Sequence, residues 1–88
     1  MSDRAAIAAE ILHQVAARGG NKSICPSEVA RALAPEEEAW RRLMGPVRDA
    51  ALALAREGRI EVLRKGRPVD PGQAVRGVIR LRIKGEPP

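Results

Sequence analysis

The sequence predicts an α+β fold in one small domain, with helices first and β-strands last. Apolar residues recur at helical spacing along the first two thirds of the chain, whereas the last third alternates between apolar and basic residues. A chain of 88 residues is long enough for a single compact core. We therefore expect one domain over residues 1–84, followed by a frayed tail at residues 85–88.

Two helices are expected in the N-terminal half of the chain. The first covers about residues 3–18, where apolar residues fall on one face and Ser2 or Asp3 can cap the start. Two consecutive glycines then end it. After a polar connector, a second helix should begin at Pro26 and continue to about Leu33, because proline suits the first position of a helix.

A third helix is expected to open with the three glutamates at residues 36–38, whose charges complement the positive end of the helix dipole. Its apolar face contains Trp40, the only aromatic residue, which we interpret as a core anchor. At Pro46, either this helix kinks or a new helix starts with the proline in its first turn. Leu52 lies on the opposite, basic face and needs cover from another element.

Two strands are expected after Gly58, which should stop the third helix. Residues 59–64 and residues 78–84 alternate between apolar and polar side chains, as a half-buried strand does. The segment between them, residues 65–77, is too long for a tight turn and is predicted to be one structured loop. Asp70 can cap a short helical turn within that loop.

The predicted core combines the inward-facing positions of these elements. Its members are Ile7, Ile11, Leu12, Val15, Val29, Leu33, Trp40, Leu43, Val47, Leu54, Ile60, Val62, Ile79 and Leu81. His13 is expected on the surface, opposite the apolar stripe of its helix. Cys25 is expected to be a small, partly buried residue at a helix start.

This order of elements predicts a winged helix, in which the second and third helices form a helix-turn-helix and the C-terminal hairpin forms the wing. The sequence also resembles a small bacterial family of uncharacterised function. Trp40 and the segments at residues 24–33 (ICPSEVARAL), 57–62 (EGRIEV) and 65–71 (KGRPVDP) carry the resemblance. It covers nearly the whole chain and implies a winged-helix fold but no established activity, so no site residues are carried over.

All of the net charge lies in the last third of the chain. Residues 58–88 hold eight basic and three acidic side chains, a net of +5, whereas residues 1–57 hold eight of each. A basic wing after a helix-turn-helix favours binding to double-stranded DNA, with the third helix in the major groove and the wing on the backbone. The candidate contacts are Arg41, Arg42 and Arg48 on the helix and Arg64, Lys65, Arg67 and Arg76 on the wing.

Two alternatives to DNA binding remain open. The glutamates at residues 36–38 repel phosphates at the start of the presumed recognition helix, so the wing or this helix can instead dock an acidic protein partner, with no nucleic-acid role. The basic residues can also be a solvated surface that keeps a small domain soluble. Recognition of single strands is disfavoured, because the chain has only one aromatic residue for base stacking.

No residue pattern indicates an enzyme. One histidine and one cysteine cannot complete a zinc site, and the chain has neither a glycine-rich phosphate loop nor a Ser/His/Asp set in a plausible order. We therefore expect no cofactor and no metal. The absence of an apolar run near about 18 residues and of a signal-peptide pattern predicts a cytoplasmic protein without a membrane segment. A monomer or a weak homodimer is expected, because the long extra helices of many dimeric regulators are absent.

Overall fold

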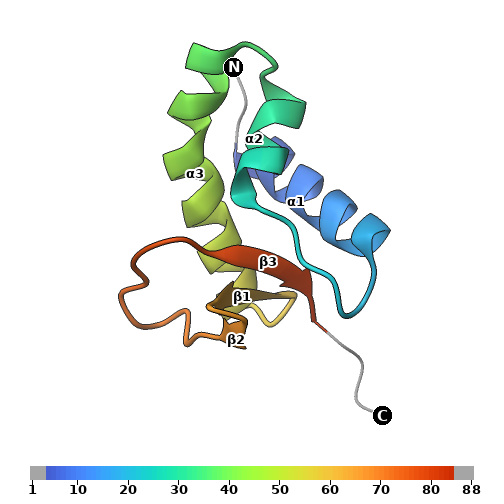
Figure 1. Ribbon diagram of the computed structural model, residues 1–88, viewed down its shortest axis with the longest axis vertical. Helices are drawn as coiled ribbons and strands as arrows, with labels where there is room; N and C mark the ends of the chain where they lie inside the picture. The colour runs from blue at the N-terminus through green and yellow to red at the C-terminus, as the bar shows by residue number, and fades with distance from the viewer. Residues whose placement is uncertain (1–3, 85–88) are drawn as a thin grey trace.

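The computed structural model describes residues 4–84, and the chain forms three helices followed by a three-stranded antiparallel sheet (Figure 1). This confirms the predicted α+β class, in an arrangement like that of a winged helix. The expected caps Ser2 and Asp3 and the expected tail at residues 85–88 lie outside the described residues. The elements are α1 (Arg4–Arg18), α2 (Pro26–Leu33), α3 (Glu37–Arg56), β1 (Ile60–Arg64), β2 (Arg67–Pro68) and β3 (Arg80–Ile83).

Helix α2 begins where the sequence predicted. Pro26 occupies the start of the helix, and the preceding residue Cys25 has extended backbone angles, as a residue before proline prefers. The Glu28 carboxylate accepts a hydrogen bond from the Cys25 backbone N–H at 2.7 Å, which is the acidic half of a capping box. The start of α2 is therefore fixed by its local sequence.

Helix α3 runs without interruption through Pro46, so no new helix starts there. The proline has no N–H, so the carbonyl of Arg42 lacks the hydrogen bond that it would otherwise accept. Gly58, with φ of 76°, ends the helix as predicted, and the Arg59 N–H donates back to the Leu54 carbonyl at 3.0 Å.

Strand β1 is the centre of the sheet, with β2 on one side and β3 on the other. In the pairing of β1 with β3, Ile60 lies opposite Ile83 and Val62 lies opposite Leu81. The connector between α1 and α2 extends the sheet beyond β3, because Ile24 and Leu81 exchange two backbone hydrogen bonds of 2.8 Å each. The N-terminal helices are thereby joined directly to the last strand.

The prediction of a single loop over residues 65–77 is wrong at its start. Lys65 and Gly66 both have positive φ, 53° and 80°, and form a two-residue turn that pairs Arg64 with Arg67. Such turns match the twist of a β-hairpin. Pro68 argued against a strand in the sequence. A proline is tolerated on an edge strand where its nitrogen faces away from the neighbouring strand, and the ladder bond to β1 comes from the Val69 N–H, which donates to the Val62 carbonyl at 2.9 Å. The chain then returns to β3 through residues 69–79, which we call the wing loop.

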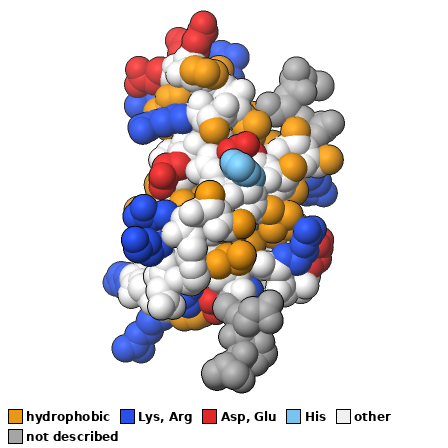
Figure 2. Space-filling model, turned by 90° about the vertical axis from the view of Figure 1, so that its right-hand side faces the viewer, with side chains coloured by type: hydrophobic (Ala, Val, Ile, Leu, Met, Phe, Trp, Pro, Cys, Tyr) orange, Lys and Arg blue, Asp and Glu red, His pale blue; other side chains and the backbone are white. Residues whose placement is uncertain are grey.

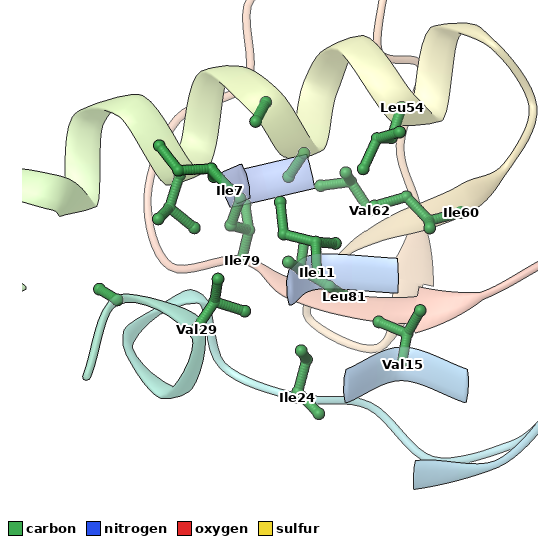
Figure 3. Close-up of a cluster of buried hydrophobic side chains, with 14 residues drawn as sticks. Ile7, Ile11, Val15, Ile24, Val29, Leu54, Ile60, Val62, Ile79 and Leu81 are labelled. Atoms are coloured by element: carbon green, nitrogen blue, oxygen red, sulfur yellow. The ribbon is translucent and has the colours of Figure 1, made fainter. Parts of the chain in front are cut away.

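The core lies between the helices and the sheet (Figure 3). Most of the predicted members are buried there, including Ile11, Leu81 and Val29, each almost without exposed surface. Four predicted members are instead half-buried and pack against the core from outside, namely Leu12, Leu33, Trp40 and Leu43. The core also contains five residues that the prediction missed, Ile24, Ala30, Ala50, Ala51 and Leu63, of which Leu63 lies outside the main cluster.

Trp40 is therefore an edge residue and not the core anchor that the sequence predicted. Its ring lies beneath the Arg31 guanidinium at 4.5 Å and near the Arg41 guanidinium at 5.1 Å. Both contacts are cation–π interactions. Trp40 closes the side of the core between α2 and α3 and still reaches the surface.

Replacing Leu81 with alanine should lower the free energy of unfolding by about 2–5 kcal/mol, because the side chain is fully buried. Trp40→Ala should cost less than the roughly 3–5 kcal/mol of a fully buried indole. Urea titration followed by circular dichroism measures both, since Trp40 is the only tryptophan and its fluorescence is lost in the second variant. A larger loss of unfolding free energy for Trp40→Ala than for Leu81→Ala would contradict the placement of Leu81 in the core and of Trp40 at its edge.

Candidate nucleic-acid interface

The β1–β2 hairpin concentrates three basic side chains at one turn. Arg64 and Arg67 are direct cross-strand partners, and Lys65 lies in the turn between them. All three are exposed, and no carboxylate of the described residues forms an ion pair with any of them. Like charges directly opposite each other destabilise a strand pair. The hairpin therefore carries a charge arrangement that its own fold does not favour.

The wing loop brings the fourth predicted cation to the same end of the molecule. Gly77 lies beside Arg64, since a Cβ on this glycine would be 3.4 Å from Arg64 Nε. Arg76, the residue before Gly77, is exposed. We call Arg64, Lys65, Arg67 and Arg76 the wing cations. The structure thus collects all four residues that the sequence assigned to the wing.

Two of the three helix arginines, Arg41 and Arg42, lie far from the wing cations. Arg41 forms an exposed ion pair with Glu37, one turn earlier, at 2.9 Å. Arg42 is exposed and has no polar partner among the described residues. Both lie in the first half of α3, at the opposite end of the molecule from the hairpin in Figure 1.

Arg48 holds the wing loop in place. Its two terminal guanidinium nitrogens donate to the carbonyls of Gly77 at 2.8 Å and Val75 at 2.6 Å. About two turns further along α3, Arg56 Nε donates to the carbonyl of Pro71 at 3.0 Å. Hydrogen bonds from a charged donor are stronger than neutral ones. These three bonds fasten the loop along one face of the helix.

The same contacts account for Leu52, which the sequence left without cover. Leu52 lies on α3 between the two anchoring arginines and is half-buried. Val69 and Val75 of the wing loop are likewise half-buried against the core. Asp70 caps a turn that is not helical, contrary to expectation: its carboxylate accepts a hydrogen bond from the Gly72 N–H at 2.8 Å, and its carbonyl accepts one from the Gln73 N–H at 3.1 Å. A lone leucine on a basic helix face was the sequence signal for this covering loop.

Other basic residues of the sheet are engaged within the fold. Arg80 donates to the hydroxyl and the carbonyl of Ser23, at 2.7 and 3.0 Å. Arg82 and Glu61 face each other across β3 and β1 and form a half-buried ion pair of 2.8 Å. Five cations of the C-terminal third have neither an ion pair nor a side-chain hydrogen bond among the described residues, and four of them lie at the hairpin and the adjoining loop, the fifth being Lys84.

The acidic residues at the start of α3 lie away from the wing. Glu36 precedes the helix and Glu37 and Glu38 form its first turn, all of them exposed. A helix of 20 residues is about 30 Å long, and the hairpin lies beyond its other end (Figure 1). In Figure 2, acidic side chains gather at the upper end of the molecule and basic side chains line the lower left edge. Repulsion from these glutamates therefore acts mainly on partners of the upper end.

Within residues 4–84, no three side chains of the His, Cys, Asp or Glu types gather as metal ligands would. His13 is exposed, as predicted, and Cys25 is half-buried at the start of α2. No helix among the described residues has the length and apolar character needed to cross a bilayer.

Residues 4–84 match the model of a family described as a protein of unknown function (DUF3253). No curated protein matches the chain. The match spans all of the described helices and strands, including the hairpin that carries the wing cations.

Arg48→Ala should release the wing loop, because two hydrogen bonds from a charged donor are lost. We expect a loss of unfolding free energy of about 1.5–3 kcal/mol and faster cleavage by trypsin after Arg76, which lies in that loop. Arg42→Ala is the matched control on the same helix, with an expected change within about 0.5 kcal/mol. Mass spectrometry identifies the cleavage site. Equal cleavage rates in the two variants would show that Arg48 does not anchor the loop.

Proposed function

The chain belongs to the DUF3253 family of proteins of unknown function, and we propose that it binds double-stranded DNA through the wing cations. The observation that carries this proposal is the pairing of Arg64 with Arg67 around Lys65, without a carboxylate partner among the described residues. A phosphate backbone supplies the missing negative charge and releases its counterions when the cations bind.

The expected binding is weak and depends little on DNA sequence. Arginine and lysine at a hairpin tip contact phosphates, which fix position but carry no sequence information. Contacts of this kind give dissociation constants on the order of 10⁻⁴–10⁻⁶ M at physiological salt. Arg42, exposed on α3, is a candidate for a second contact, whereas Arg48 is already bonded to the wing loop.

An acidic protein partner is the second candidate, and one observation favours it. Trp40 is half-buried between two guanidinium groups at the end of the molecule where the glutamates repel DNA. Tryptophan and arginine are enriched at protein interfaces. In this alternative the wing cations contact carboxylates of the partner protein. Any binding to duplex DNA then depends only on the net charge of the protein and not on the position of these residues.

Replacing Arg64 and Arg67 with glutamine should weaken binding to a mixed-sequence duplex and reduce its salt dependence. Each lost phosphate contact lowers the slope of log K against log salt by about 0.9. The control replaces Arg18 and Lys22, two exposed cations of the N-terminal half, and removes the same charge. Fluorescence anisotropy at several salt concentrations measures both variants. If the two double variants lose affinity equally, net charge and not the hairpin is responsible.

Glu37→Gln tests whether bound DNA also reaches α3, where removal of a repulsive charge and release of Arg41 from its ion pair should tighten binding. The same assay measures it beside Glu10→Gln, which removes one negative charge from α1. A stronger effect of Glu37→Gln would place DNA along α3 as well as on the wing. Indistinguishable effects would restrict the contact to the hairpin.

A further inference from the structure

Two hollows adjoin on the face between α2, α3 and the end of the wing loop. Each has a volume of about 460 Å³, and both are lined by Val78, so they meet at this residue, and we call the two together the groove. One half lies against α2 and α3, and the other lies against the hairpin. A total of this size is within the range of small-molecule sites.

The half against the helices is largely apolar. Pro26 at the start of α2, Met44 on α3 and Ile79 before β3 form its walls. Gly45 adds no side chain, and a Cβ at this position would meet no atom within 4 Å. Because glycine has no Cβ to clash with the ring of the following Pro46, it suits this position in the helix. It also leaves this half of the groove without a side chain at position 45.

The half against the hairpin is basic. Arg64, Lys65 and Arg80 line it, and no aspartate or glutamate lines either half. Arg80 and Arg48, which lines the apolar half, are bonded to neutral oxygens of Ser23 and of the wing loop, so their charges are not compensated there. Two other hollows of the described residues each include a carboxylate among their lining residues. The groove is therefore suited to an anion.

Val78 stands at the junction of the two halves and is 82% exposed. Among the described residues it is the only large hydrophobic side chain exposed to this degree. The backbone next to Val78 is held in place, because the carbonyl of the preceding Gly77 accepts a hydrogen bond from Arg48. An exposed valine held between an apolar hollow and a cluster of cations offers contact to a chain that ends in a negative charge.

We propose that this groove binds an aliphatic carboxylate, with the hydrocarbon chain against Met44 and Val78 and the carboxylate near Arg64 and Lys65. The chain is held by burial of apolar surface, and the head by charge-assisted hydrogen bonds. The groove is open to solvent, so binding is weak, with a dissociation constant on the order of 1 mM for a chain of about eight carbons.

Octanoate, below the concentration at which it forms micelles, is the probe. In the protein without DNA, the methyl resonances of Met44, Val78 and Ile79 should shift with octanoate and not with acetate, which has the charge but no chain. Octanol has the chain but no charge and should bind at least about tenfold more weakly, the equivalent of one lost favourable contact of about 1.4 kcal/mol. No shift with octanoate, or an equal response to octanol, would overturn the proposal.

Cys25 provides an independent readout, because this single thiol lines the apolar half of the groove. Octanoate should slow its alkylation by iodoacetamide, and acetate at the same concentration should not. Equal rates with the two carboxylates would count against occupation of the apolar half.

Val78→Asp tests the position of the head and the chain together. It places a negative charge at an exposed site in the groove and should weaken octanoate binding at least about tenfold, through lost apolar contact and like-charge repulsion. Ala74→Asp is the matched control, since it adds the same charge to an exposed position of the wing loop outside the groove lining. Equal octanoate affinities in the two variants would overturn the proposal that octanoate binds in the groove at Val78. These measurements use no DNA, so their outcome is independent of the proposed DNA binding.

Discussion

The pairing of Ile24 with Leu81 joins the two halves of this domain. Two backbone hydrogen bonds of 2.8 Å connect the segment between α1 and α2 to the last strand, which is far from it in sequence. Both side chains are buried, so the polar groups of these backbones must find partners inside the protein. The pair fixes β3 between Ile24 and β1, and α1 packs against β3. Arg80, the residue before Leu81, strengthens the same junction by binding Ser23.

Arginine has two distinct roles in this molecule, and the difference lies in the acceptor. Arg48 and Arg56 bond to backbone carbonyls of the wing loop, which would otherwise need water or another donor. Arg64 and Arg67 face each other with neither carbonyl nor carboxylate partners among the described residues. The first pair stabilises the fold, whereas the second leaves unbalanced charge at the surface. The fixed wing loop lies beside the unbalanced pair, because Gly77 adjoins the Arg64 side chain.

Local signals in the sequence were sufficient for the helix boundaries but not for the path of the wing. Pro26 and Gly58 act through their own backbone conformations, so the ends they mark were predictable. The Lys65-Gly66 turn was missed because Pro68 makes the following strand look like loop. The anchoring by Arg48 depends on carbonyls 27 and 29 residues away, and a backbone acceptor leaves no trace in the sequence. The predicted hairpin was enough to place the wing cations near one another. The distance of Arg41 and Arg42 from them became visible only in the tertiary structure.

The outer edges of the sheet are short, and this affects how the protein behaves at high concentration. Strand β2 has only two residues, and one of them is Pro68, which has no N–H for a further strand. On the other side, Ile24 occupies the middle of β3 and leaves flanking positions that carry Arg80 and Arg82. Short, charged or proline-containing edges are the means by which β-sheet proteins avoid pairing with one another. Aggregation through added strands is therefore disfavoured at both edges, although the sheet itself is small and open.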